Sequence, residues 1–210
     1  IQFIEKNYPD FIEHLSSTKS PQQMLGAVVK SYWAKKMKVD PKDVVTVSIM
    51  PCTAKKFEKD RPEMQVDGVR DIDHVLTTRE LAQLLKTNSV DLLAQKPMPY
   101  DSPLGLSTGA AVIFGATGGV MEAALRTAYE LVTGKEVPFA HLDITPVRGM
   151  EGIREASVQI PETVPEFEFL EGATVKVAVA HGLANIRTVM DKLRECRSKG
   201  LPYPWHFVEF

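Results

Sequence analysis

The chain has 210 residues, 44% of them apolar, which is enough to bury a hydrophobic core in one large or two small domains. Its 25 basic residues nearly cancel its 27 acidic residues, and the net charge of -2 excludes a strongly basic field for nucleic acid. No run approaches the roughly 20 apolar residues that cross a bilayer. The two cysteines are too few for a disulfide framework or a complete four-cysteine metal site.

The first part of the chain predicts two helical segments. Apolar residues at helical spacing predict a helix within residues 2–15, in which Pro9 marks either a break or the helix start. Ser20 followed by Pro21 is typical of a helix start, because a hydroxyl can cap the helix and proline suits its first position. This predicts a helix over 21–37 with a buried face of Met24, Val28, Val29, Tyr32 and Trp33.

The next part predicts a strand, a capped helix and a long loop. The β-rich run 43–50 predicts a buried strand that ends at Pro51, which places Cys52 at its carboxyl end. Residues 77–80, Thr-Thr-Arg-Glu, form a capping box that predicts a helix stopping near residue 88. Residues 97–109 are rich in Pro, Gly and Ser, and a loop of this length is often functional.

The second half predicts one helix and then alternating strands and helices. Thr117 is the expected cap of a helix over 118–133, whose apolar face would hold Val120, Ala124, Ala128 and Leu131. Strands are expected at 140–147 and 154–160, around a turn at 148–152. A strand at 173–181, a helix to about residue 199 and a strand at 205–210 predict a βαβ unit. We therefore predict an α/β protein, with two lobes of parallel or mixed sheets flanked by helices.

Cys52, Lys55 and Glu58 follow the predicted strand at intervals of three residues. A nearby cation favours the thiolate, which is the form of cysteine that binds metals. Lys55 could also bind an anionic ligand of that metal, and Glu58 could orient the ammonium through a charge-assisted hydrogen bond. The plainer alternative is a buried free cysteine beside a surface ion pair.

The run 50–58, M-P-C-x-x-K-x-x-E, resembles the second of three signature motifs of the catalytic domain of iron-only ([FeFe]) hydrogenases. The resemblance continues in 16–23, 71–81 and 113–126, and it covers nearly the whole chain. It implies that residues 1–210 are part of the hydrogenase large-subunit catalytic (H-cluster) domain. The active site would lie in a cleft between two α/β lobes.

The resemblance also implies a cofactor, a [4Fe-4S] cluster joined through one cysteine sulfur to a diiron unit with CO, cyanide and dithiolate ligands. Carried over by position, Cys52 is expected to bind the [4Fe-4S] cluster. Lys55 is expected to donate to a cyanide on iron, with Glu58 beside it. The other implied site residues are Ser20, Pro21 and Gln22 in a second ligand pocket, Met50, Phe114 and Gly115 around the diiron unit, and Ser16 in the proton relay.

Several of these residues have plainer interpretations. Ser16 could be an ordinary helix-end residue, and Met50 and Phe114 would be core by default. The pair Gly118-Gly119 could suggest a phosphate loop, but no Lys-Ser/Thr follows it. Cys196 matches no family ligand and is expected to be a free surface thiol. The histidines, including His141 and His181, have no ligand spacing.

The family's other two motifs fall outside the sequence. The first would lie just before Ile1 and the third would start at Glu209 and continue past Phe210. The chain contains one of four expected cluster thiolates, so we expect residues 1–210 alone to be inactive.

The leading functional prediction is an iron-sulfur oxidoreductase that oxidises H2 and reduces protons reversibly. The expected partners are H2, protons, an electron carrier such as ferredoxin, and maturation proteins. The cytoplasm is the favoured location, with the periplasm left open. A second hypothesis is a non-catalytic relative that assists iron-sulfur assembly or senses hydrogen. A third is an α/β ligand-binding domain without metal. Lys55 and Glu58 favour catalysis, because a relative without a cyanide-bearing diiron unit has no evident need for them.

Overall fold

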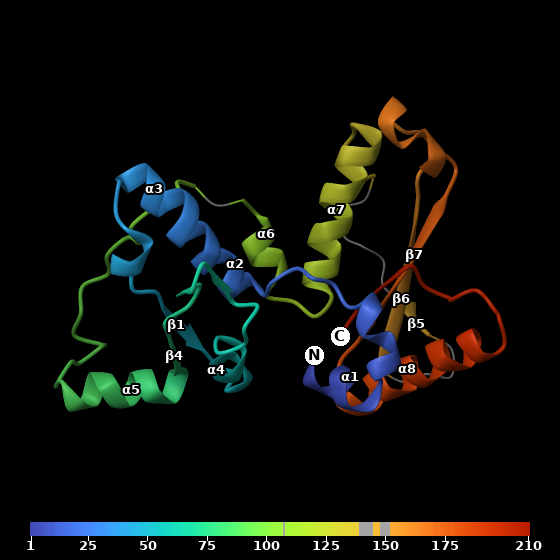
Figure 1. The fold of residues 1–210 in the computed structure, drawn as a ribbon. Helices are drawn as coiled ribbons and strands as arrows, with labels where there is room; N and C mark the ends of the chain where they lie inside the picture. The colour runs from blue at the N-terminus through green and yellow to red at the C-terminus, as the bar shows by residue number, and fades with distance from the viewer. Residues whose placement is uncertain (107, 139–144, 148–151) are drawn as a thin grey trace. The chain divides into compact units, whose positions relative to one another are not determined.

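The structure is a computed structural model that describes residues 1–106, 108–138, 145–147 and 152–210 (Figure 1). The chain divides into two compact units, residues 15–106 and residues 1–14 with 107–210. Both units combine helices with small sheets, which confirms the α/β class. A cleft between two lobes stays a prediction.

The unit of residues 15–106 begins with one continuous helical run. It consists of α2 (Pro21–Val28), a π-helical turn η2 (Val29–Trp33) and α3 (Ala34–Met37), which confirms the predicted helix over 21–37. The run ends at Lys38, which adopts the left-handed conformation with φ 57°. π-helical turns are rare and often mark functional sites.

The predicted buried face of this helical run is wrong. Met24, Val28 and Tyr32 are 37%, 42% and 60% exposed. The buried positions are instead Gln22, Gln23, Gly26, Lys30 and Ala34. Gln22 and Lys30 can be buried because each has a hydrogen-bond partner on a neighbouring segment, and burial of a paired polar group costs far less than burial of an unpaired one.

Two parallel strands, β1 (Val47–Met50) and β4 (His74–Thr77), pair in the register Val47 to His74. The predicted strand over 43–50 starts later than expected, because Pro41–Asp43 forms the 3-10 turn η3. The other elements between β1 and β4 are α4 (Ala54–Glu58) and a hairpin of β2 (Gln65–Val66) and β3 (Val69–Arg70).

The capping box at residues 77–80 is confirmed. Thr77 Oγ1 accepts from Glu80 N–H at 3.2 Å, and the Glu80 carboxylate accepts from Thr77 N–H at 2.8 Å. The helix that follows is α5 (Thr78–Thr87), with Asn88 at its C-cap. No element is assigned from residue 89 to residue 106, which agrees with the predicted long loop.

The other unit contains a four-stranded sheet in the order β5-β6-β7-β8. Its strands are β5 (Thr145–Pro146), β6 (Ile153–Gln159), β7 (Thr174–Ala180) and β8 (Phe207–Glu209). The first three are antiparallel neighbours, and β8 is parallel to β7. With α8 (Leu183–Ser198) between them, β7 and β8 form the predicted βαβ unit. The strand expected at 140–147 and the turn at 148–152 lie largely outside the described residues.

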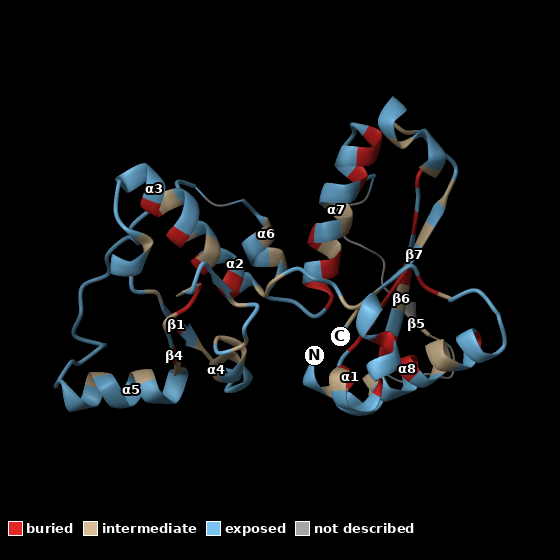
Figure 2. Cartoon of the chain, in the orientation of Figure 1, coloured by how far each residue is buried: buried red, intermediate tan, exposed pale blue. Residues whose placement is uncertain are grey.

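Alternate residues of β7 contact two separate cores. Val177 and Val179 pack with Met121 and Tyr129 of α7 (Gly119–Thr133), whereas Ala178 and Ala180 pack with Val189 of α8. Successive strand residues point to opposite faces, so α7 and α8 cover opposite faces of this sheet. Figure 2 shows buried positions along α7 and the β6–β7 pair.

The predicted ends of α7 are confirmed, but its predicted buried face is wrong. Val120 and Leu131 are 43% and 66% exposed, and Ala124 and Ala128 are also exposed. The buried positions include Met121, Tyr129 and Val132, on another side of the helix. Alanine fits either side of a helix, so the pattern left the buried side ambiguous.

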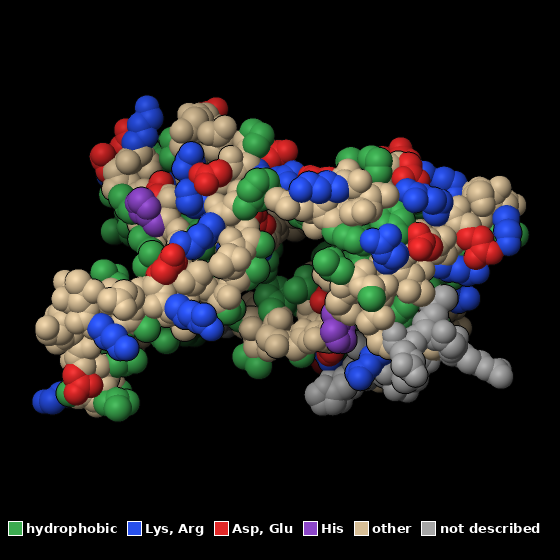
Figure 3. Space-filling view, turned by 90° about the horizontal axis from the view of Figure 1, so that it is seen from below, with side chains coloured by type: hydrophobic (Ala, Val, Ile, Leu, Met, Phe, Trp, Pro, Cys, Tyr) green, Lys and Arg blue, Asp and Glu red, His purple; other side chains and the backbone are tan. Residues whose placement is uncertain are grey.

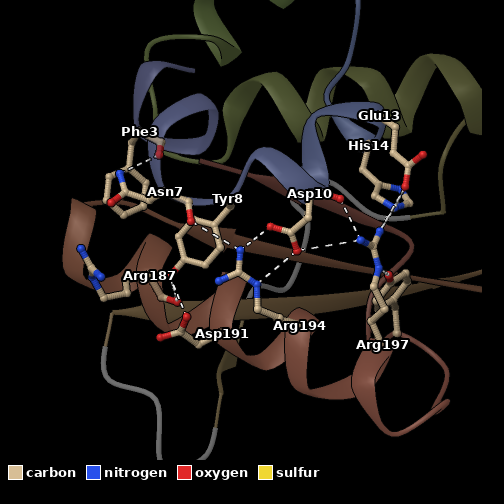
Figure 4. Close-up of polar contacts among 11 residues, drawn as sticks. Phe3, Asn7, Tyr8, Asp10, Glu13, His14, Arg187, Asp191, Arg194 and Arg197 are labelled. Carbon is tan, nitrogen blue, oxygen red and sulfur yellow. Dashed lines mark hydrogen bonds and ion pairs between the residues drawn. The ribbon is translucent and has the colours of Figure 1, made fainter.

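The first residues of the chain pack on α8 (Figure 4). They form α1 (Gln2–Asn7) and the 3-10 helix η1 (Pro9–His14), so Pro9 both follows a break and starts a helical turn. Tyr8 Oη donates to Asp191 Oδ1 at 2.7 Å, and the Arg194 guanidinium lies 4.5 Å from the centre of the Tyr8 ring. Asp10 forms ion pairs with Arg194 and Arg197. These contacts join the two sequence-distant parts of this unit.

Two further elements complete this unit, α6 (Ala110–Ile113) and the 3-10 helix η4 (Pro165–Leu170). No helix among the described residues is both long and apolar enough to cross a membrane. Lys and Arg side chains alternate with Asp and Glu on the face seen in Figure 3, which agrees with the near-zero net charge.

Candidate active site

Cys52 lies two residues after the end of β1, in the turn that leads into α4. Its side chain is exposed and forms no disulfide. The prediction that β1 is a buried strand is wrong for most of its length, since Val47 and Ile49 are 54% and 49% exposed while Ser48 is buried. The Cys52 thiol is accessible in the described fold, two residues past the carboxyl end of β1.

The Glu58 carboxylate accepts hydrogen bonds from three side chains. Its Oε2 atom lies 2.9 Å from Ser20 Oγ, 2.8 Å from Gln22 Nε2 and 3.2 Å from Lys55 Nζ. The Glu58 side chain is only 13% exposed. Donors from the start of α2 and from α4 thus converge on one partly buried anionic oxygen, where charge-assisted hydrogen bonds are stronger than neutral ones.

Gln22 extends this network to strand β1. Ser48 Oγ donates to Gln22 Oε1 at 2.6 Å, and both residues are buried, at 8% and 6% exposure. The bond fixes which end of the Gln22 amide faces Glu58, because its oxygen accepts and its nitrogen donates. A chain of contacts therefore runs from β1 through α2 to α4.

Two partly buried lysine–aspartate pairs support the same segments, and sequence reasoning missed both. Lys19 Nζ lies 2.5 Å from Asp71 Oδ2, and Lys30 Nζ lies 2.6 Å from Asp73 Oδ2. The Asp71 side chain is 3% exposed and the Lys30 side chain 7% exposed. The only signal in the sequence was the Asp-x-Asp pattern before β4, which carries no partner information.

The pKa of Asp73 reflects this environment. Burial tends to raise it, but hydrogen bonds from Lys30 and from Thr46 outweigh burial and keep the pKa below its ordinary value. Asp73 therefore stays ionised. The aspartate contacts the helical run at its π-helical turn, where Lys30 lies.

The remaining predicted site residues of this unit show less contact. Ser16 is exposed, and its Oγ accepts from Thr18 N–H at 3.1 Å. Pro21 occupies the first position of α2, as expected. Ser20 forms no side-chain cap, since its hydroxyl donates to Glu58 instead. Met50 is the half-buried last residue of β1.

Phe114 and Gly115 belong to the other unit. Phe114 is the C-cap of α6 and is 37% exposed. A Cβ on Gly115 would meet only the Val112 carbonyl oxygen, at 3.4 Å, so nothing among the described residues demands glycine there. A glycine at this position leaves its backbone accessible to a bound group.

The prediction that Cys196 is a surface thiol is wrong. Cys196 is 5% exposed and lies seven residues after the fully buried Val189, which places both on the inward side of α8. Within the described residues, no three His, Cys, Asp or Glu side chains gather as a metal site. His141 lies outside the described residues.

All 210 residues match the family described as "Iron only hydrogenase large subunit, C-terminal domain". The chain belongs to this family. It is 47% identical over 209 residues to the "Periplasmic [Fe] hydrogenase large subunit" of Nitratidesulfovibrio vulgaris, covering 100% of this chain and 46% of that protein. The structure matches a variant of the [FeFe]-hydrogenase HydA1 from Chlamydomonas reinhardtii with a TM-score of 0.80 and 43% identity, covering 99% of this chain and 55% of that chain.

A more distant relative is named for a different role. The "Cytosolic iron-sulfur assembly component 3" of Mus musculus is 31% identical over 215 residues, covering 100% of this chain and 42% of that protein. The chain thus spans about half the length of these relatives. The family assignment agrees with the resemblance carried by residues 50–58.

Proposed function

We propose that this chain forms part of the catalytic domain of an [FeFe]-hydrogenase that oxidises H2 and reduces protons reversibly at a [4Fe-4S]–diiron H-cluster. The observation that carries the proposal is that Ser20, Gln22 and Lys55 all donate to Glu58 in a chain of the hydrogenase family. Lys55 and Glu58 follow Cys52 by three and six residues. When bound, the diiron unit supplies the redox centre at which hydrogen and protons are interconverted.

The donor set of the chain fits such a group. Cys52 offers an exposed thiol, as a thiolate ligand of the [4Fe-4S] cluster requires. Lys55 uses one of its three N–H bonds on Glu58, which leaves two for an anionic ligand such as an iron-bound cyanide. The Lys55 side chain is 29% exposed, so it is accessible from outside the fold.

Glu58 has a positioning role in this proposal. Its carboxylate neutralises and orients the Lys55 ammonium while it also fixes Ser20 and Gln22 at the start of α2. Ser20, Pro21 and Gln22 would line a second pocket for diatomic ligands, where the helix start supplies free backbone N–H donors. A hydrogen-bonded set of this kind keeps donors in place before a ligand arrives.

The other residues have simpler proposed roles. Met50, Phe114 and Gly115 would surround the diiron unit and limit access of water. Ser16 would pass protons, since its exposed hydroxyl can accept and donate in the same chain of hydrogen bonds. H2, protons, a ferredoxin-like electron carrier and maturation proteins are the proposed partners. We propose a cytoplasmic location, although the names of the relatives include both a periplasmic and a cytosolic protein.

The alternative function is iron-sulfur assembly, favoured by the 31% identity to the assembly component. The 47% identity to a hydrogenase subunit supports catalysis over assembly. The two functions predict different outcomes when the full-length protein is produced together with hydrogenase maturation proteins. A hydrogenase would evolve H2 from a reduced electron donor, and an assembly factor would not.

The matched variants are Cys52→Ala and Cys196→Ala, one at each cysteine of the chain. We expect Cys52→Ala to lose the cluster iron and the H2 evolution, because it removes a metal ligand. Cys196→Ala should retain both, since Cys196 is buried on the inward side of α8. A matured wild-type protein that binds iron but neither evolves nor consumes H2 would contradict the proposed catalysis.

A further inference from the structure

Helix α7 is capped by a residue that lies 88 positions away in the sequence. Glu209 Oε1 accepts from the backbone N–H of Gly118 at 3.1 Å, and Glu209 Oε2 accepts from the backbone N–H of Met121 at 2.7 Å. Gly118 is the N-cap of α7 and Met121 its third residue. An N-cap side chain normally satisfies the N–H of the second or third residue of a helix.

The local sequence cannot supply this cap itself. Gly118 has φ 81°, a conformation that favours glycine, so the N-cap position has no side chain. A Cβ on Gly119 would lie 1.8 Å from the Ile113 carbonyl oxygen, so this position also requires glycine. Thr117, the cap expected from sequence, makes no such bond; α7 has no side-chain cap from its own N-cap residue.

Glu209 is well placed to act from outside the helix. It lies on β8, which pairs with β7 in the register Val179 to Glu209. Its carboxylate carries the charge that the partial positive end of a helix favours, and each oxygen meets one free N–H. The contact therefore connects the last strand of the sheet to the turn between α6 and α7.

That turn contains Phe114 and Gly115. It is compact, because Gly115 N–H donates to Val112 O at 3.2 Å and Gly119 N–H donates to Ala116 O at 2.9 Å. A shift of Gly118 would therefore displace the residues just before it. Loss of the Glu209 contact would release the carboxyl end of this turn from β8.

We propose that Glu209 is a positioning residue, whose carboxylate fixes the 114–118 turn and thereby the surroundings of the diiron unit. This inference rests on the proposed function, in which Phe114 and Gly115 surround that unit. Glu209 acts through these residues and touches no reacting group itself.

The experiment uses the full-length matured protein with Glu209→Gln, Glu209→Asp and a control, Glu168→Gln, at an exposed position of η4. Two measurements are made on each variant. Hydrogen exchange reports protection of the Met121 amide in the protein without diiron unit. Infrared spectroscopy reports the CO and cyanide bands after maturation.

Glutamine offers one acceptor oxygen and an NH2 group, which cannot accept from a backbone N–H. We expect Glu209→Gln to lower protection of the Met121 amide by about fivefold, the ratio that corresponds to a typical N-cap. We also expect shifted or broadened infrared bands. Glu209→Asp keeps a carboxylate, so it should retain part of the Met121 amide protection and bands closer to wild type. Glu168→Gln should change neither the protection nor the bands.

Infrared bands in Glu209→Gln that match wild type, together with reduced amide protection, would show a purely structural cap and overturn the inference. Unchanged amide protection would also overturn it, since the contact would then be absent in solution. If the matured wild-type protein shows no CO or cyanide bands, the proposed function fails instead. The two failures are therefore distinguishable.

Discussion

Gln22 donates from Nε2 to Glu58 Oε2 at 2.8 Å, which ties the first turn of α2 to the last residue of α4. Because Ser48 fixes the other end of the same amide, the contact also depends on strand β1. Every residue of the network lies in the unit of residues 15–106. We test its contribution to stability in the protein before maturation.

Glu58→Gln should destabilise this network. The substitution removes the charge and turns one oxygen into an NH2 donor that faces the donors of Ser20, Gln22 and Lys55. We expect the free energy of unfolding to fall by roughly 1 to 3 kcal/mol, the cost of leaving buried polar groups unsatisfied. Denaturant unfolding of the full-length protein before maturation measures the change.

The control for this change is Glu63→Gln, at a side chain that is 61% exposed. An exposed pair contributes little to stability, so this variant should unfold like wild type. Equal stability of the Glu58 and Glu63 variants would mean that the network contributes nothing.

Lys19→Met should cost more. The Asp71 side chain is 3% exposed, and loss of its lysine leaves a buried carboxylate without its ion pair. Removal of one partner of a buried pair costs roughly 3 to 5 kcal/mol, and we expect the lower end here because the Lys19 side chain is 25% exposed. The double variant Lys19→Met/Asp71→Asn should recover part of the loss. Additive losses in a double-mutant cycle would show that the pair is not coupled.

Gly26→Ala tests the close approach of α2 to residues 71–72. A Cβ at this position would lie 2.2 Å from the Asp71 carbonyl oxygen and 2.8 Å from Ile72 Cδ1. Since a backbone atom must move, we expect a loss of at least about 2 kcal/mol. The matched control is Gly109→Ala, where a Cβ would meet nothing within 4 Å. A Gly26→Ala variant as stable as Gly109→Ala would contradict this packing.

Glu80 should show an acid-sensitive contribution to stability. A hydrogen bond from Lys56, followed by bonds from the backbone and side chain of Thr77, lowers the pKa of Glu80 from 4.5 to about 2. Because the folded-state pKa is the lower one, this contribution is present above pH 4.5 and is lost as the pH falls from about 4.5 to about 2. NMR titration of the carboxyl carbon measures the pKa. Lys56→Met should raise it, and an unshifted Glu80 in wild type would refute the interpretation.

The sequence predicted those features that depend on local chemistry. Pro21 after Ser20 predicted where α2 begins, and Thr77 with Glu80 predicted the start of α5, because both signals act within one helical turn. The run 50–58 predicted the family. Contact between Lys55 and Glu58 follows from their spacing of three residues in α4.

Other features depend on contacts between distant residues. Nothing in the sequence near Gln22 predicts that Ser48 and Glu58 would bind its amide. The burial of this polar residue of α2, in place of the expected apolar residues, was therefore not predicted. The α7 cap was missed for the same reason, since Glu209 reaches it from β8. The placement of Phe114 around a diiron unit stays a prediction.

The central claim is that Lys55 donates to an anionic ligand of the diiron unit. Its most direct test is infrared spectroscopy of the full-length matured Lys55→Met variant, with iron analysis and with Lys36→Met, an exposed lysine of α3, as control. Methionine keeps the apolar stem but removes all three donors, and a lost charge-assisted bond costs roughly 1.5 to 3 kcal/mol. We predict that Lys55→Met retains the [4Fe-4S] iron but loses or shifts the CO and cyanide bands, while Lys36→Met matches wild type. Wild-type bands and H2 evolution in Lys55→Met would contradict the account.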